Sequence, residues 1–175
     1  MKIALPLVLL LFAWLVWRAW HIGPRPEAGA SAPDFALSDQ LGNRHRLSDY
    51  AGRWLVLYFY PRDDTPGCTR EACAFRDGLA KLQAAGAAVL GVSVDTQASH
   101  AGFAEKYHLN FPLLADTDGS VARRYGTLMD WKLLRLARRN TFLINPQGKV
   151  WRVYGRVDPT RHADEILADL ARAAQ

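Results

Sequence analysis

The chain has only two cysteines, Cys68 and Cys73, and they are the side chains best suited to redox chemistry. They follow the apolar, strand-like residues 54–60, and Thr65 and Pro66 come just before Cys68. Threonine followed by proline is typical of a helix start, with Thr65 at the N-cap and Pro66 at the first helical position. In the first turn, free backbone N–H groups and the helix dipole stabilise a thiolate. The pattern predicts a reactive Cys68; the alternative is an inert, buried small hydrophobe.

The spacing of five residues limits how the two thiols can meet. On an ideal helix it puts the two Cα atoms about 8.6 Å apart, whereas a disulfide tolerates at most about 7 Å. A Cys68–Cys73 bond therefore requires the first turns of the helix to unwind. Such a place suits a bond that forms during turnover and is then reduced, because strained disulfides are labile. In the alternative, both thiols stay reduced and never meet.

The residues from Pro61 to Cys68 resemble the active-site signature of the peroxiredoxins, Pro-x-x-x-Thr-x-x-Cys. The run 66–77, which includes Cys73, is similar to the Q-type, or bacterioferritin-comigratory, branch of that family. The resemblance extends from about Ala32 to the C-terminus, with further similar stretches in family order at residues 91–95, 103–107, 111–116 and 139–145.

The resemblance implies a thioredoxin-dependent peroxidase that acts on hydrogen peroxide and organic hydroperoxides. In such an enzyme Cys68 would attack the peroxide and become a sulfenic acid, and Cys73 would condense with it to give an intramolecular disulfide. The reductant would be thioredoxin or a thioredoxin-like dithiol protein. Because the resolving thiol lies in the same chain, we expect a monomer.

Three further residues receive roles from the resemblance. Thr65 would hydrogen-bond the peroxide, Pro61 would shield the thiolate from water, and Arg139 would stabilise the thiolate and the peroxide oxygens. Each has a structural alternative. Thr65 can serve only as a helix cap, and Pro61 can simply end a strand. Arg139 belongs to a basic run with Arg135 and Arg138 and can be part of a solvated face.

The remaining chain alternates between strand and helix patterns, which predicts an α/β sheet covered on both faces. The resemblance makes this a thioredoxin-like fold, with a central mixed sheet flanked by helices, in one domain of residues 32–175. The turn at residues 145–148 predicts a hairpin between the last two strands. We expect strands at residues 54–60, 88–94, 113–115, 142–144 and 150–154, and helices at 71–85, 97–107, 120–125 and 162–174.

The N-terminus carries an uncharged, apolar stretch at residues 3–17. Trp14 and Trp17 within it, and Trp20 just beyond it, would suit a membrane interface. We expect a transmembrane anchor or signal segment within residues 1–21 and a flexible linker at 22–31. The protein would then be membrane-anchored, on the periplasmic or extracytoplasmic side if the segment is signal-like. The alternatives are secretion after cleavage, although the small-residue sites lie about ten residues beyond the apolar run, and a buried core helix.

Composition excludes several other functions. The net charge of +5 is spread along the chain, which argues against a nucleic-acid module. The five histidines lack metal-ligand spacing, so we expect no metal. The motifs Gly-x-Gly-x-x-Gly and Gly-x-Ser-x-Gly are absent from the sequence, and we expect no cofactor.

Two other functions remain open at this point. A membrane-anchored thiol–disulfide oxidoreductase acting on protein disulfides would carry Cys-x-x-Cys at the helix start, and here four residues separate the cysteines. A non-enzymatic, anchored thioredoxin-like binding module would have no need for Thr65, Cys68 and Arg139 together.

Overall fold

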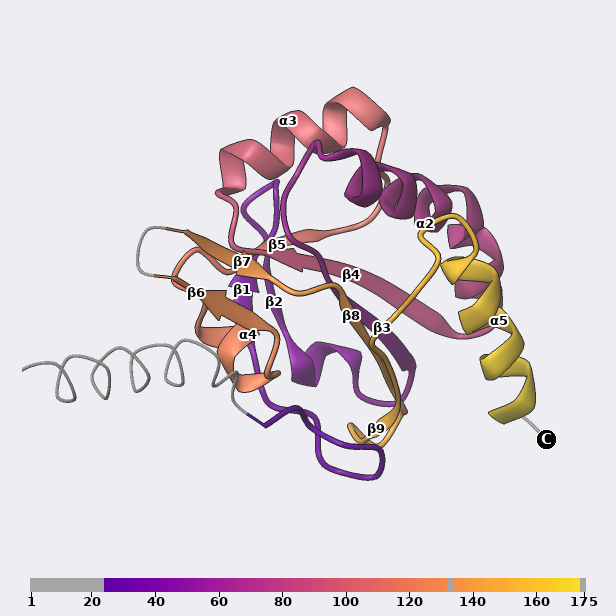
Figure 1. Ribbon diagram of the computed structural model, residues 1–175. Coiled ribbons are helices and arrows are strands. Elements are labelled where there is room, and N and C mark those ends of the chain that lie inside the picture. Colours follow the sequence, from indigo (N-terminus) through magenta and orange to yellow (C-terminus); the bar gives the residue numbers. More distant parts are fainter. Residues whose placement is uncertain (1–23, 132–133, 174–175) are drawn as a thin grey trace, which may run out of the picture.

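The computed structural model describes residues 24–131 and 134–173. A five-stranded mixed sheet forms its centre, in the order β5-β4-β3-β8-β9 (Figure 1). Strand β3 pairs in parallel with β4 and antiparallel with β8, which in turn pairs antiparallel with β9. The strands are β3 (Trp54–Phe59), β4 (Ala87–Ser93), β5 (Leu113–Ala115), β8 (Asn140–Ile144) and β9 (Val150–Tyr154).

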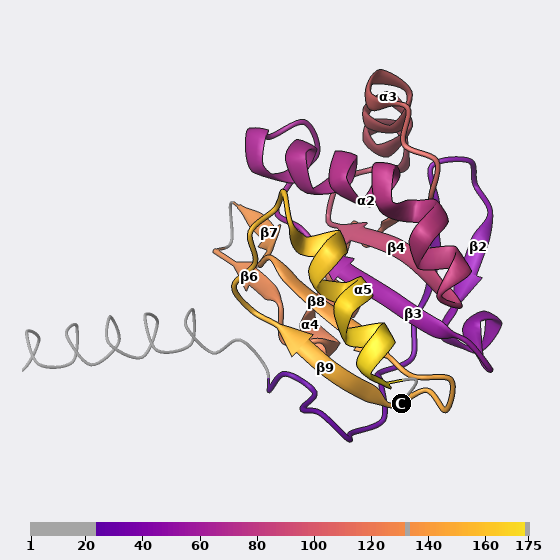
Figure 2. The ribbon, with the colours of Figure 1, turned by 90° about the vertical axis from the view of Figure 1, so that its right-hand side faces the viewer.

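Both faces of the sheet are covered, which explains why β3 is almost continuously apolar. Alternate side chains of β3 enter two cores. Val56 and Tyr58 pack under α2 (Pro66–Ala84), α3 (Gln97–Tyr107) and α5 (His162–Ala173). Leu55 and Leu57 face the opposite core, which contains α4 (Ser120–Arg124). Figure 2 shows α2 and α5 side by side on one face of the sheet.

Most of the predicted elements are confirmed. The helix at 97–107 and the strands at 113–115 and 150–154 have the predicted bounds, and the other predicted strands differ by one or two residues at their ends. The helix predicted at 71–85 begins earlier, at Pro66, with Thr65 at the N-cap as the local pattern indicated. The predicted hairpin turn is also present, because the N–H of Gly148 donates to the carbonyl of Asn145 at 2.9 Å.

Five short elements were not expected from the sequence. They form two peripheral hairpins and one 3-10 turn, and each is only three or four residues long. Each of the four strands among them contains a polar residue, so none shows the uninterrupted apolar run that marks the equally short strand at 113–115. They are β1 (Ala36–Ser38), β2 (Arg44–Arg46), η1 (Leu47–Tyr50), β6 (Leu128–Asp130) and β7 (Arg135–Ala137).

Residues 29–32, at the junction of the predicted linker and the predicted domain, are hydrogen-bonded to the last hairpin. The N–H of Gly29 donates to the carbonyl of Val150 at 2.7 Å, and the N–H of Val150 donates to the carbonyl of Ala30 at 2.9 Å. The N–H of Ala32 bonds the carbonyl of Gly148 at 2.9 Å. Part of the segment predicted as a linker therefore pairs with the start of β9. The anchor predicted within residues 1–21 lies outside the described residues.

Candidate active site

Cys68 lies in the first turn of α2, where the sequence pattern put it, and is only 2% exposed. Arg139 lies in the connection between β7 and β8, and its side chain contacts Cys68. The guanidinium Nη2 of Arg139 donates to Cys68 Sγ at 3.2 Å. A charged donor at this distance stabilises a thiolate more than a thiol. The structure thus brings together two predicted site residues that are far apart in the sequence.

The residue before Cys68 leaves space for this contact. A Cβ atom placed on Gly67 would lie 3.3 Å from Arg139 Nη2. This is a tight approach, and a side chain here would require the guanidinium to shift. The glycine therefore lets Arg139 lie directly against the start of α2.

Glu71 is a site residue that sequence reasoning missed. Its side chain is completely buried, and its Oε2 accepts a hydrogen bond from Arg139 Nη1. Its Oε1 is buried without a hydrogen-bond partner among residues 24–131 and 134–173. Its position in the sequence could have revealed it, because Glu71 follows Cys68 by three residues and residues three apart on a helix share a face. Arg139 is therefore held between a carboxylate and the thiol.

Burial raises the pKa of Glu71 from 4.5 to about 7, although Arg139 acts to lower it. A carboxyl whose pKa is higher in the folded state binds more protons when folded, so stability falls as the pH rises between the two values. We expect the free energy of unfolding of the wild type to fall by up to about 3 kcal/mol relative to Glu71→Gln between about pH 4.5 and pH 7. Urea unfolding at both ends of this range measures it.

Glu105→Gln, at an exposed position of α3, is the matched control for this experiment. It changes the same chemical group without a buried environment and should follow the wild type at both pH values. If Glu71→Gln also follows the wild type, the carboxyl of Glu71 does not titrate in this range.

An aromatic wall lies under the first turns of α2. Tyr58 of β3 is fully buried, with its ring centroid 4.7 Å from that of Phe75 and 5.4 Å from that of Tyr60. Burial, together with the negative charge of nearby Glu71 and Cys68, raises the pKa of the Tyr58 hydroxyl well above its usual value. The hydroxyl therefore stays neutral, and its ring packs in the same hydrophobic core as Cys68.

Thr65 and Pro61 lie on the loop that leads into α2. Thr65 occupies the N-cap position with extended backbone, and its Oγ1 donates to the carbonyl of Arg62 at 3.1 Å. Pro61 directly follows Tyr60, whose N–H makes the last sheet bond, 3.1 Å to the carbonyl of Val92. Pro61 thus lies where the strand ends, which is the purely structural role that the sequence also allows for it. The hydroxyl of Thr65 keeps lone pairs with which to accept a further hydrogen bond.

Cys73 lies on the same helix as Cys68, as the sequence predicted. Both cysteines are free thiols, and Cys73 is half-buried. Helix α2 runs without interruption from Pro66 to Ala84. The helical separation of about 8.6 Å between the two Cα atoms therefore applies, and it is too long for a disulfide.

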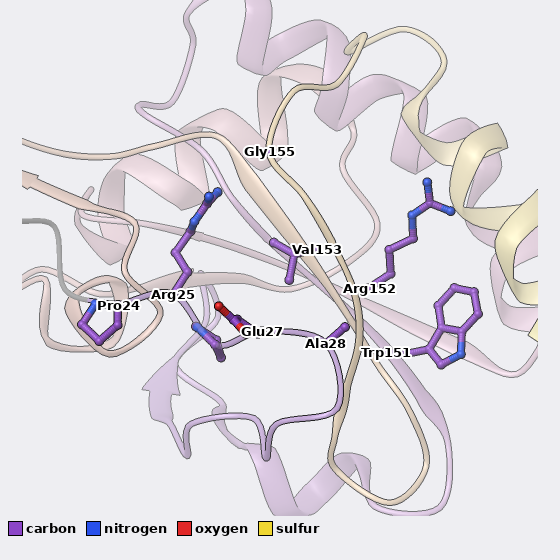
Figure 3. Close-up of a pocket in the computed structure, with 9 residues that line it drawn as sticks. Pro24, Arg25, Glu27, Ala28, Trp151, Arg152, Val153 and Gly155 are labelled. Atoms are coloured by element: carbon purple, nitrogen blue, oxygen red, sulfur yellow. The ribbon is translucent and has the colours of Figure 1, made fainter.

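A separate hollow lies elsewhere on the protein. It has a volume of about 700 Å³ and lies between the N-terminal residues 24–28 and strand β9 (Figure 3). Its described lining, which includes Arg25, Trp151 and Val153, contains none of the predicted site residues. We therefore place the chemistry at the start of α2 rather than in this hollow.

Comparisons with known proteins show the family of this chain. Residues 28–153 match the model of the AhpC/TSA family. The chain is 42% identical over 148 residues to a putative peroxiredoxin bcp of Coxiella burnetii, covering 82% of this chain and 98% of the relative. It is 44% identical over 146 residues to the chloroplastic peroxiredoxin Q of Arabidopsis thaliana, covering 83% of this chain and 67% of the relative.

The predicted membrane-anchored localisation, with its secreted alternative, is wrong on these findings. No helix within residues 24–131 and 134–173 is long and apolar enough to cross a membrane. Among the relatives above, the one whose name gives a location is chloroplastic. The prediction depended on residues 3–17, which lie outside the described part of the chain. Their uncharged length is also short of the about 20 apolar residues that a spanning helix needs.

Solved structures show the same relationship in three dimensions. Peroxidoxin BcpB from Mycobacterium tuberculosis superposes with a TM-score of 0.80 at 37% identity, covering 86% of this chain and 99% of that one. A structure of peroxiredoxin Q from Xanthomonas campestris gives 0.74 at 38% identity, covering 81% and 92%. The predicted thioredoxin-like fold is thus confirmed for the domain. Likeness of this extent in sequence and structure shows that the chain belongs to the AhpC/TSA family and is a peroxiredoxin, a thiol-dependent enzyme that reduces peroxides.

Proposed function

We propose that the chain reduces hydroperoxides through a sulfenic acid at Cys68 and an intramolecular Cys68–Cys73 disulfide, which thioredoxin or a thioredoxin-like dithiol protein reduces. The observation that carries the proposal is the contact of 3.2 Å between Arg139 Nη2 and Cys68 Sγ at the start of α2. The bacterioferritin comigratory protein of Xanthomonas campestris, 37% identical to this chain, has alkyl peroxide reduction activity. Organic hydroperoxides are accordingly among the substrates that we propose here.

In the first step, the Cys68 thiolate attacks the terminal oxygen of the peroxide and breaks the O–O bond. The sulfur loses two electrons and becomes Cys–SOH, while the second oxygen leaves with a proton from solvent as an alcohol or water. Arg139, already aimed at the sulfur, donates to the oxygens as they gain charge. Thr65 accepts the hydrogen bond of the peroxide O–H, and Pro61 shields the sulfur from bulk water.

In the second step, the Cys73 thiol attacks the sulfenic sulfur of Cys68, and the disulfide forms with loss of one water. Because α2 keeps the two Cα atoms too far apart, its first turns must unwind for this step. A dithiol partner then gives two electrons and two protons, which restores both thiols. The resolving thiol belongs to the same chain, so the cycle needs no second subunit, and we propose a monomer.

The assay for this proposal couples the purified full chain to thioredoxin, thioredoxin reductase and NADPH. We expect one NADPH oxidised per hydrogen peroxide or cumene hydroperoxide, and a Cys68–Cys73 disulfide in the oxidised protein by mass spectrometry.

Cys73→Ser tests the resolving step separately. We expect it to reduce about one equivalent of peroxide and then to stop, because its sulfenic acid has no internal partner and is over-oxidised unless a small thiol is added. Unchanged turnover of Cys73→Ser with thioredoxin would refute the role of Cys73, while the role of Cys68 would stand.

A further inference from the structure

Two consecutive aspartates in the loop before the catalytic helix, Asp63 and Asp64, are both bound by helix α3. This helix contributes none of the catalytic residues proposed above. We name this group of contacts the α3 latch; it consists of the two aspartates and their α3 partners Ser99, His100, Lys106 and Tyr107.

The buried half of the α3 latch is the contact between His100 and Asp63. His100 is completely buried, with Nδ1 2.9 Å from Asp63 Oδ2 and Nε2 3.2 Å from the carbonyl oxygen of Leu114. The ring therefore bridges the loop carboxylate and the backbone of β5, and the hydroxyl of Tyr60 lies 3.3 Å from the same Nδ1. Asp63 also accepts from Ser99 Oγ at 2.6 Å and from the hydroxyl of Tyr60 at 2.7 Å. Burial acts to raise the pKa of Asp63, but the bond and charge of His100 hold it below its usual value.

The exposed half holds an unusual backbone conformation. Asp64 has φ of 56°, in the left-handed region that residues other than glycine rarely adopt. Its two carboxylate oxygens accept from Lys106 Nζ and from the hydroxyl of Tyr107, each at 2.6 Å. The next residue is Thr65, the N-cap of α2. The chain therefore enters the catalytic helix from a point that α3 holds in place.

A buried pair of hydrogen-bonded polar groups is weak evidence for added stability, because their loss of hydration offsets their attraction. Removal of one partner is costly, however, so the pair strongly favours one position of the loop. That position matters here because the catalytic cycle requires two states of α2. In the wound state, the helix keeps Cys68 in contact with Arg139. In the unwound state, Cys73 can reach Cys68 and form the disulfide.

We propose that the α3 latch is a positioning device that biases α2 toward its wound, peroxide-reactive state, with His100 as its central residue. This inference rests on the proposed function, because it concerns the two steps of that cycle. Loss of the latch shifts the equilibrium toward the unwound state, so oxidation of Cys68 becomes slower and formation of the disulfide becomes faster. Loss of stability without repositioning would not move the two rate constants in opposite directions.

The test is rapid mixing of the reduced full-length protein with hydrogen peroxide, followed by tryptophan fluorescence and by mass spectrometry of quenched samples. His100→Gln keeps a donor but cannot bridge Asp63 and Leu114. We expect it to lower the rate constant of Cys68 oxidation about tenfold and to raise that of disulfide formation about tenfold. It should also give less sulfinic acid at the same peroxide concentration, because the disulfide forms before a second oxidation.

His108→Asn is the matched control, since His108 is an exposed histidine in left-handed conformation at the end of the same helix. Both of its rate constants should equal those of the wild type. A folded His100→Gln whose two rate constants are unchanged, or fall together, overturns the inference.

Tyr107→Phe decides the question if His100→Gln does not fold. It removes one bond to Asp64 from the exposed half, and we expect opposite shifts of about two- to threefold; no shift overturns the inference. A wild type that neither consumes peroxide nor forms the Cys68–Cys73 bond would instead refute the proposed function. If the wild type consumes peroxide and forms the disulfide, and the latch variants have the same two rate constants as the wild type, the proposed function stands and only the latch is refuted.

Discussion

Cys68→Ser abolishes peroxide reduction: we expect the second-order rate constant with hydrogen peroxide to fall by at least about ten-thousandfold. A serine hydroxyl remains protonated under conditions in which Arg139, 3.2 Å from the sulfur, stabilises a thiolate. Oxygen also cannot accept the transferred oxygen atom as sulfur does. The measurement is peroxide consumption in competition with a heme peroxidase. Serine is nearly the size of cysteine, and the variant should fold normally.

Cys73→Ser is the matched control for this experiment, because it removes the other thiol of the same helix. It should keep the wild-type rate constant in the first turnover. Peroxide consumption by Cys68→Ser at the wild-type rate would mean that another side chain is oxidised, and the assignment of the nucleophile would be wrong.

Arg139→Gln is expected to lower the rate constant for Cys68 oxidation by about a hundred- to a thousandfold. The guanidinium uses separate nitrogens for its two partners, Nη2 for Cys68 and Nη1 for Glu71. Its removal takes the charged donor from the thiolate and from the peroxide oxygens. Arg139→Lys should restore little of the rate, because one ammonium lacks the planar fork that reaches both partners. Stopped-flow fluorescence under pseudo-first-order peroxide measures each rate constant.

Arg138→Gln tests the specificity of this effect, since Arg138 is the adjacent residue, carries the same charge and is exposed. It should react like the wild type; an equal loss in both variants would point to general positive potential rather than to a specific contact. Arg139→Gln also leaves Glu71 buried without a cation. The double variant Arg139→Gln with Glu71→Gln should therefore recover stability but not the rate, which separates folding from chemistry.

Local patterns in the sequence are sufficient for the parts of this protein that local chemistry controls. Thr65 and Pro66 predict the start of α2, and hence the first-turn position of Cys68, because capping and the fixed φ of proline act within a few residues. If both thiols lie on one helix, the five-residue spacing to Cys73 predicts that this helix must unwind before they can meet. The strands of the central sheet follow from short apolar runs between turn residues, and the helices that cover it follow from apolar residues at helical spacing.

Contacts between distant segments are decided only by the tertiary structure. Local chemistry does not distinguish Arg138 from Arg139; only the family resemblance selected Arg139 from the sequence, and the path of the chain into β8 places its guanidinium against Cys68. Nothing in the sequence distinguishes Glu71 from other glutamates. Only the fold buries its side chain, and this burial raises its pKa. His100 and Asp63 are 37 residues apart and meet only because α3 packs beside the loop that leads into α2. The physical reason is common to all three: burial and hydrogen-bond partners depend on which segments the fold brings together, and a single sequence does not contain that information locally.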